Sequence, residues 1–228
     1  MKLNLVRRKP EAPGVESFVF RPAEPLIWKA GQYLHYVLHH EPTDDRGSDR
    51  WFTVASAPFE KEVMITTRHA SEKSSSFKEA LFAMKEGEEI EISSVEGEFT
   101  VEDAGRDYVF LAGGIGITPF HSILKQADKD GTKLKVNLIY SNRDENVPYR
   151  AELESFAKNN SGISIHYVAA PERIDEAKIR GLVPDLKTPM FYVSGPAPMV
   201  FALSETLEKM GVTKENIKLD DFPGYPAD

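Results

Sequence analysis

The chain has 228 residues, and its 28 lysines and arginines against 36 aspartates and glutamates give a formal net charge of −8. This charge disfavours general binding to nucleic acid or to an anionic membrane, because both are polyanions. The absence of cysteine excludes disulfides, thiolate nucleophiles, cysteine-ligated zinc and cysteine-ligated iron–sulfur clusters within the chain. The six histidines lack metal-ligand spacing, so no metal is expected. No apolar run reaches the ~20 residues of a membrane span and no signal-peptide core is found, so a cytoplasmic location is expected.

The first half of the chain, residues 1–103, is typical of a small antiparallel β-barrel. Segments rich in β-branched and aromatic residues alternate with turn signals, which predicts six strands. These strands cover residues 15–21, 32–40, 51–55, 63–68, 89–93 and 98–101. One helix interrupts them, because the serines at 74–76 precede apolar residues at helical spacing and Gly87 follows.

The second half, residues 104–228, alternates strands with helices. The predicted strands are 108–112, 136–140, 163–169, 190–194 and 217–219, and the predicted helices are 118–127, 149–157, 174–182 and 198–210. This alternation predicts an α/β domain with a five-stranded parallel sheet covered on both faces. The boundary falls near residues 102–106, an acidic segment that contains Gly105.

Charge is divided unevenly between the halves. Residues 1–104 carry 13 lysines and arginines against 19 aspartates and glutamates, whereas residues 105–228 carry 15 against 17. Two interpretations follow: a solvated acidic surface, or an acidic barrel that docks a basic electron-transfer partner.

Three glycines stand between a predicted buried strand and a predicted helix, at Gly113, Gly114 and Gly116. Glycines there let the backbone approach a bulky anion, and the free N–H groups of the helix start attract a pyrophosphate. Thr118 is expected to cap the helix, with Pro119 in its first turn. The alternative is a tight strand–helix turn without a ligand.

Two further turns are predicted at the same end of the sheet. One is Ser194-Gly195-Pro196 after the strand at 190–194, and the other contains Asn142 and Arg143 after the strand at 136–140. Ligands of open α/β sheets bind at the carboxyl ends of the strands, so these turns predict a nucleotide across the sheet.

In the first half, the strand at 51–55 places Arg50 and Phe52 on one face and Thr53 on the other. An arginine beside an aromatic ring suits a phosphate and a flat ring system.

Together these segments resemble the ferredoxin–NADP⁺ reductase superfamily. The family motifs Arg-x-aromatic-Ser/Thr, Gly-Gly-x-Gly-x-Thr-Pro and Cys/Ser-Gly-Pro match residues 50–53, 113–119 and 194–196, in the family's order. The resemblance implies a flavin-binding barrel and a nicotinamide-binding α/β domain. It implies FAD rather than FMN, because most relatives use FAD, and either NADPH or NADH as the substrate.

The resemblance also assigns residue roles. As catalytic residues it implies Thr53, near the flavin N5, and Ser194, near the nicotinamide. The implied flavin contacts are Arg50, Trp51, Phe52, Thr53, Arg68, Ser75, Ser76 and Phe222. The implied dinucleotide contacts are Gly113, Gly114, Gly116, Thr118, Asn142, Arg143, Gly195 and Pro196.

The chain departs from the family at three places. Phe52 stands where a tyrosine is frequent, and Ser194 stands where many members have cysteine. The family's C-terminal acidic and aromatic residues are partly matched by Asp221 and Phe222, and the chain then continues to residue 228. We hypothesise that Phe222 or Tyr225 covers the far face of the flavin, and the alternative is a tail packed on the barrel.

The implied reaction is hydride transfer from NAD(P)H to the flavin, followed by electron transfer to a separate acceptor. The acceptor is a redox protein (a ferredoxin, a flavodoxin or an oxygenase component) or a small molecule. The nucleotide stays open, because Arg143 and Arg150 favour a 2′-phosphate while Asp144 and Glu145 oppose it. Two alternatives remain: an electron-transfer subunit active only within a larger complex, and a nucleotide-binding sensor on the same fold.

Overall fold

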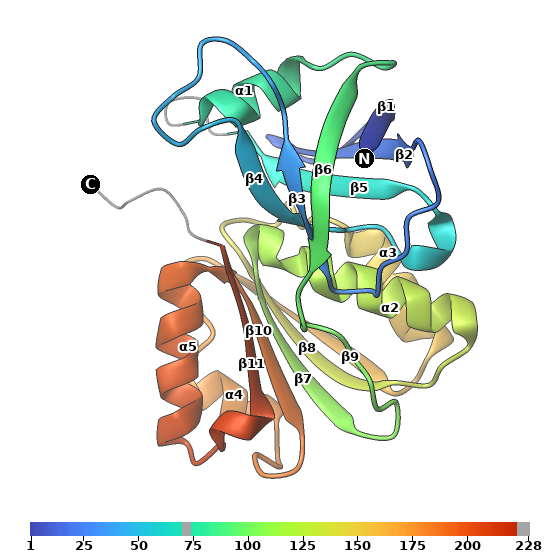
Figure 1. Cartoon of the computed structure of the whole chain (residues 1–228). Coiled ribbons are helices and arrows are strands. Elements are labelled where there is room, and N and C mark those ends of the chain that lie inside the picture. The colour runs from blue at the N-terminus through green and yellow to red at the C-terminus, as the bar shows by residue number, and fades with distance from the viewer. Residues whose placement is uncertain (70–73, 223–228) are drawn as a thin grey trace.

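The structure is a computed structural model that describes residues 1–69 and 74–222, without the side chain of Phe222. Two sheets form the molecule: a bent antiparallel sheet built by the first half of the chain and a parallel sheet built by the second (Figure 1). The two-sheet architecture predicted from the sequence is confirmed.

The antiparallel sheet has six strands in the order β4-β3-β6-β1-β2-β5. Their bounds are β1 Lys2–Ala12, β2 Val15–Pro22, β3 Tyr33–Val37, β4 Asp49–Thr53, β5 Val63–Arg68 and β6 Glu89–Glu96. The sheet bends into a half-barrel, and the chain leaving edge strand β4 meets the opposite edge strand β5 where Ala55 N donates to Met64 O at 2.8 Å. Helix α1 (Ser76–Ala83) packs Phe77 and Leu81 into the barrel core.

Two strand predictions in this half are wrong. β1 was not predicted, because Arg7, Arg8 and Lys9 obscure the alternation that buries Leu3 and Leu5. Residues 98–101 form no strand, since Phe99 is buried between the two sheets and not paired in a ladder. The other five predicted strands are present as β2 to β6.

The parallel sheet has the order β11-β10-β7-β8-β9. Its strands are β7 Asp107–Gly113, β8 Lys135–Asn142, β9 Ile163–Ala169, β10 Met190–Pro196 and β11 Ile217–Phe222. Its helices are α2 Thr118–Asp130, α3 Arg150–Asn159, α4 Glu176–Leu182 and α5 Ala197–Lys209, with short 3₁₀ turns at Pro58–Glu60 (η1), Gly114–Ile117 (η2) and Lys214–Asn216 (η3). Every predicted strand and helix of this half is present.

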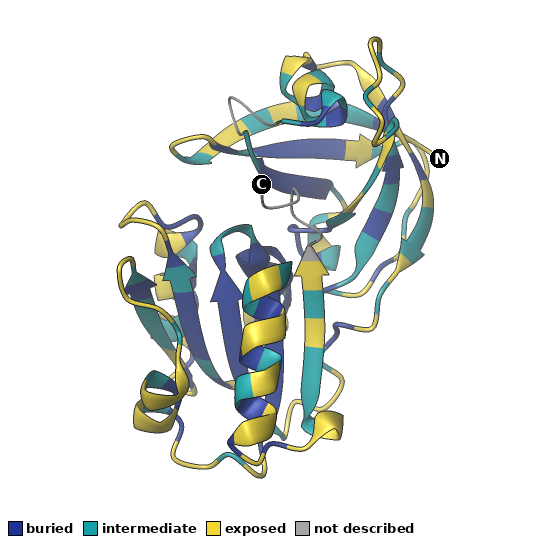
Figure 2. Ribbon diagram, turned by 90° about the vertical axis from the view of Figure 1, so that its left-hand side faces the viewer, coloured by how far each residue is buried: buried dark blue, intermediate teal, exposed yellow. Residues whose placement is uncertain are grey.

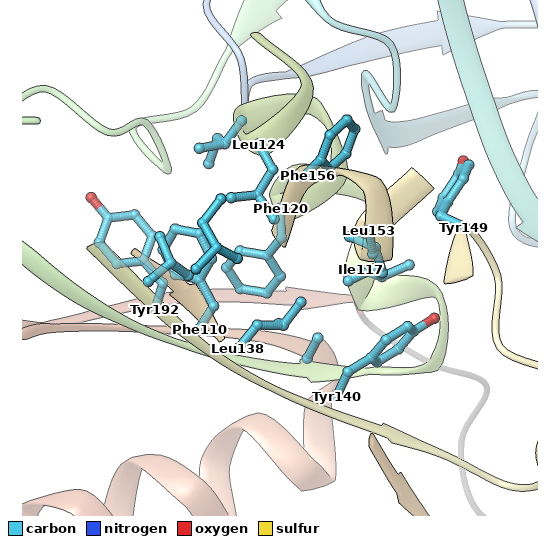
Figure 3. Packing of buried hydrophobic residues seen from close by; sticks show 14 of the residues in the cluster. Phe110, Ile117, Phe120, Leu124, Leu138, Tyr140, Tyr149, Leu153, Phe156 and Tyr192 are labelled. Atoms are coloured by element: carbon cyan, nitrogen blue, oxygen red, sulfur yellow. The ribbon is translucent and has the colours of Figure 1, made fainter. Parts of the chain in front are cut away.

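Alternation along the strands makes three layers. On β7, Phe110 faces the cluster that includes Phe120 of α2 and Leu153 of α3, whereas Leu111 faces the cluster of α4 and α5. Figure 3 shows the first cluster, in which the Phe110 and Phe120 rings stack with centroids 4.5 Å apart. Figure 2 shows α5 with its inner side buried against the sheet and its outer side exposed.

The two sheets share part of their core. Ala55, Met64 and Phe99 belong to the same buried cluster as Phe110 and Phe120 of the α/β half. The predicted boundary at residue 103 therefore lies in a connection between sheets that pack directly on each other. No helix among the described residues is long and apolar enough to cross a membrane.

Candidate functional site

The glycine turn lies at the carboxyl end of the central strand β7. Gly113 ends the strand, and residues 114–117 make a 3₁₀ turn before α2 begins. Gly114 adopts φ +54°, in the left-handed region that favours glycine, and a Cβ on it would meet open space. A Cβ on Gly116 would lie 2.2 Å from Ser194 O, so only glycine fits there. The turn is thus tight on the β10 side and open at Gly114.

Thr118 does not cap α2, contrary to the prediction. The 3₁₀ turn moves the helix start, so that Ile117 is the N-cap and Thr118 is already helical. The Thr118 hydroxyl donates to Ile115 O at 3.1 Å, and it thereby stabilises the turn instead.

The three predicted turns lie side by side, because β10, β7 and β8 are neighbours in the sheet. Gly195 packs against the Gly113 backbone, and Tyr140 of β8 donates its hydroxyl to Gly114 O at 3.0 Å. Asn142, at the end of β8, is buried, and its Nδ2 has no hydrogen-bond partner among the described residues. Arg143 is exposed, whereas Arg150 lies over the Tyr167 ring at 4.2 Å.

An acidic residue that sequence reasoning missed completes this corner. Ser194 is fully buried and donates its hydroxyl to Asp220 Oδ2 at 3.0 Å. The parallel register of the structure pairs Ser194 with Asp220 and places Asp221 one position further on, and no motif in the sequence indicates this pairing. Burial raises the pKa of Asp220 to about 6, although the bond from Ser194 opposes the shift.

We expect Asp220→Asn to stabilise the protein above pH 6. The pKa of this carboxyl is higher in the folded than in the unfolded chain, so its ionisation destabilises the fold as pH rises through about 6. The gain at pH 8 is about 3 kcal/mol, and it disappears below about pH 4. Chemical denaturation at pH 4 and pH 8 measures it; an equal effect of the substitution at both pH values would contradict this assignment.

The second part of the site is centred on Arg50 in β4. Its Nη1 donates to the carbonyls of Arg46, at 2.6 Å, and Gly47, at 3.2 Å, which fixes the guanidinium under the loop before β4. Its Nη2 is buried without a hydrogen-bond partner in the described part of the chain, and Asp44 Oδ1 is 3.8 Å away. A buried N–H of this kind is costly unless an acceptor is supplied.

The start of α1 adjoins this guanidinium. Ser75 is the N-cap, and its hydroxyl accepts from Lys78 N at 3.3 Å, as predicted for a helix start. Ser76 N donates to Asp44 Oδ2 at 2.8 Å, so a carboxylate already lies at the helix N-terminus beside Arg50. The Ser76 amide, followed by Arg46, lowers the pKa of Asp44 to about 2. The arrangement therefore stabilises an anion.

The other predicted flavin contacts on β4 are divided between the two faces of the strand. Phe52 is half-buried, with its ring 5.8 Å from the Phe77 ring, and Thr53 is buried at the end of β4. Trp51 projects from the opposite face of β4, where its ring contacts those of Tyr33 and His35. Phe222 ends β11, and its side chain, like Tyr225, lies outside the described residues, so the hypothesis about the tail stays a prediction.

The two parts of the site face each other across the sheets. Tyr33 pairs with Thr53, and its pKa is raised by burial and then by the charges of Glu96 and Asp220. Burial raises the pKa of Tyr140, and the positive charge of Arg68 opposes this rise. β5 also contacts the 3₁₀ turn η2 that contains the glycines. No metal-ligand cluster is found within residues 1–69 and 74–222.

Comparisons with known proteins agree with this geometry. Residues 110–205 match the family model "Oxidoreductase NAD-binding domain". One subunit of the Na(+)-translocating NADH-quinone reductase of Marinomonas sp. is 31% identical over 160 residues, which cover 63% of this chain and 39% of the relative. The ferredoxin reductase component of 3-ketosteroid-9-alpha-monooxygenase from Rhodococcus rhodochrous is 25% identical over 228 residues, covering 96% and 64%. The chain thus spans about two-fifths to two-thirds of these relatives.

Solved structures show the same fold. The flavohem-like FAD/NAD-binding domain of the nitric oxide dioxygenase from Vibrio cholerae superposes with a TM-score of 0.84 at 20% identity, covering 97% of this chain and 98% of that one. The ferredoxin-NADP⁺ reductase of Plasmodium falciparum gives 0.79 at 16% identity, covering 97% and 96%. Residues 110–205 thus match an oxidoreductase NAD-binding domain, and the whole chain has the two-domain fold of the ferredoxin-NADP⁺ reductase of Plasmodium falciparum.

Proposed function

We propose that this chain is a flavin-dependent oxidoreductase that takes hydride from NADPH or NADH onto FAD and passes electrons to a separate acceptor. The observation that carries the proposal is the convergence of two cradles. An anion site at Arg50 and the start of α1 lies on the barrel, and a glycine turn lies on the facing end of the parallel sheet. A flavin nucleotide and a nicotinamide nucleotide each need one such phosphate site.

The residues of the barrel cradle fit a flavin pyrophosphate. The Asp44 carboxylate occupies an anion position between Ser76 N and the guanidinium of Arg50, and the Arg50 Nη2 still lacks a hydrogen-bond acceptor among the described residues. A phosphate oxygen at this position would accept from both groups. FAD, when bound, supplies the ring that accepts the hydride.

The protein's part in the reaction is placement. Arg50 and the α1 start anchor the phosphates, while Ser75 supports the helix start as its N-cap. Phe52 offers a half-buried aromatic face to a flavin ring, and Thr53 offers a hydroxyl at its edge. Arg68 ends β5, the strand that contacts the 3₁₀ turn of the glycines.

On the nicotinamide side, the open backbone at Gly114 receives the pyrophosphate, and Gly113 and Gly116 keep the turn tight. The nicotinamide position is bordered by Ser194, Gly195 and Pro196. The buried carboxyl of Asp220 is held by Ser194 and can store a proton near neutral pH. Asn142 and Arg143 bind the adenosine end of the nicotinamide nucleotide, where the Nδ2 amide of Asn142 can donate a hydrogen bond.

A steady-state assay tests the proposal. The purified protein is loaded with FAD, or with FMN as the comparison, and oxidation of NADPH and NADH is followed with menadione, an uncharged acceptor. We expect stoichiometric uptake of FAD and turnover that depends on it. A protein that takes up neither flavin would refute the proposal and favour a nucleotide-binding sensor.

A second candidate is an electron-transfer subunit that turns over only within a larger complex. It is supported by the relatives, because the Marinomonas protein is named as a subunit and the Rhodococcus protein as a component. Flavin that NAD(P)H reduces in one turnover, but that menadione reoxidises slowly, would favour this candidate over the free enzyme.

A further inference from the structure

An aromatic patch lies on the outer face of the barrel, next to the proposed flavin site. It consists of Tyr33 and His35 of β3 and Trp51 of β4, which lie on one face because Tyr33 pairs with Thr53 and His35 with Trp51. The Trp51 ring lies 4.3 Å from the His35 ring and 5.3 Å from the Tyr33 ring, between centroids. Yet 46% of Trp51 is exposed. Tryptophan and tyrosine are enriched among the residues that contribute most of the binding energy at protein interfaces.

The patch is continuous with the site. β4 is an edge strand, and Trp51 stands between Arg50 and Phe52, which face the proposed flavin from the other side. Tyr33 pairs with Thr53 at the end of β4, the residue implied to lie near the flavin N5. A protein bound on this face is therefore separated from the proposed flavin by a single strand, β4, at the edge of the sheet.

The rim of the patch is acidic. Residues 86–105 contain eight aspartates and glutamates and no lysine or arginine. Glu91 and Glu96 of β6 share the outer face with the patch, because they pair with Val37 and Tyr33, and both are exposed. Neither forms a salt bridge with a described residue, and Lys2, the cation beside Glu91, is paired with Glu89 at 2.8 Å.

Asp49 adds a further carboxylate on the same face. Its carboxylate accepts a hydrogen bond from His35 Nε2 at 2.7 Å and remains half-exposed beside Trp51. Figure 1 shows β4, β3 and β6 side by side above β11, which carries Asp220. Apolar rings within a ring of carboxylates match a partner that presents an apolar contact surrounded by lysine or arginine.

Resting on the proposed function, we propose that this face, the Tyr33–His35–Trp51 patch with Asp49, Glu91 and Glu96, docks a basic electron-carrier protein that accepts electrons from the flavin. The patch supplies the desolvated contact, and the carboxylates steer the encounter and set the orientation. An acidic carrier is repelled from this face.

Charge reversal tests the proposal. Cytochrome c serves as the basic carrier and menadione as the small acceptor, with the FAD-loaded protein under anaerobic conditions at low ionic strength. Glu91→Lys/Glu96→Lys should lower kcat/KM for cytochrome c about tenfold or more, and added salt should weaken the wild-type rate. The control Glu205→Lys/Glu215→Lys makes the same change of net charge on the α/β domain and should stay within about twofold of wild type.

Menadione separates the two proposals. Its reduction should be equal in all these variants, and its absence in the wild type would refute the proposed function itself. Trp51→Ala, with flavin content measured in the same sample, should lower the ratio of cytochrome c to menadione turnover. Equal cytochrome c rates in the two double variants, or a wild-type rate that rises with salt, would overturn the docking surface.

Discussion

Arg50→Ala should weaken FAD binding by about 2–4 kcal/mol, which is roughly 30- to 1000-fold in Kd. The guanidinium is fixed by the carbonyls of Arg46 and Gly47, and its Nη2 is buried without an acceptor among the described residues. A phosphate would therefore gain a charge-assisted bond from a group that is already in position. Flavin titration followed by fluorescence quenching measures the effect.

Two companion variants make this result specific to the anion site. Arg21→Ala removes an exposed arginine of the same sheet, paired with Glu62, and should leave the Kd within about twofold. Asp44→Asn should tighten FAD binding, because it removes the carboxylate that competes for Ser76 N and Arg50. Wild-type affinity in Arg50→Ala, with the fold intact by circular dichroism, would exclude Arg50 from the flavin site.

His121→Ala should lower the free energy of unfolding by about 3 kcal/mol. His121 is fully buried in α2, its Nδ1 lies 2.7 Å from Ala55 O, and its Nε2 lies 3.0 Å from Glu152 Oε2. A carbonyl and a carboxylate only accept, so the doubly protonated ring is the form that satisfies both. The ring also stacks on Tyr149 at 3.9 Å. The substitution thus breaks a link between the barrel and the α/β half.

The pH dependence distinguishes this link from simple packing. The bond from His121, with the charges of His121 and Lys125, holds the pKa of Glu152 well below its usual range. A depressed carboxyl pKa stabilises the fold above its ordinary value near 4.5, and that stability is lost as pH falls toward the folded pKa. Glu152→Gln should therefore be destabilised at pH 7 and approach wild type in acid.

Urea denaturation at pH 7 and pH 3 measures both effects. His166→Ala on β9 is the matched control, because that half-buried ring has no hydrogen bond to a described residue. It should change the free energy of unfolding by less than about 1 kcal/mol. If His121→Ala were no more harmful than His166→Ala, the interdomain role of His121 would be wrong.

The α/β half was predictable because its signals are local. Each buried strand is bounded by a turn, and the glycines at 113, 114 and 116 mark a place where the backbone must approach Ser194 closely. The barrel was less predictable, since its strands are short and partly polar. The charged residues Arg7 to Lys9 conceal the alternation of β1. The sequence around Phe99 is typical of a strand, although this side chain fills the space between the two sheets.

The candidate site follows the same rule. Arg50, Ser75 and the glycines are readable from motifs, and the structure brings them into two facing cradles. Asp44 and Asp220 were missed, because each acts through a partner about 30 residues away, Ser76 and Ser194. Such pairs depend on loop conformation and on sheet register, and neither leaves a local pattern in the sequence.

An anaerobic titration of the FAD-loaded protein with NADPH and then NADH tests the central claim most directly. The account predicts a flavin absorption band at about 450 nm that bleaches when one of the two nucleotides is added, because hydride passes to the flavin. That result would also identify the donor. A flavin band that neither nucleotide bleaches would contradict the account, since the facing cradles would then not bring the two cofactors together.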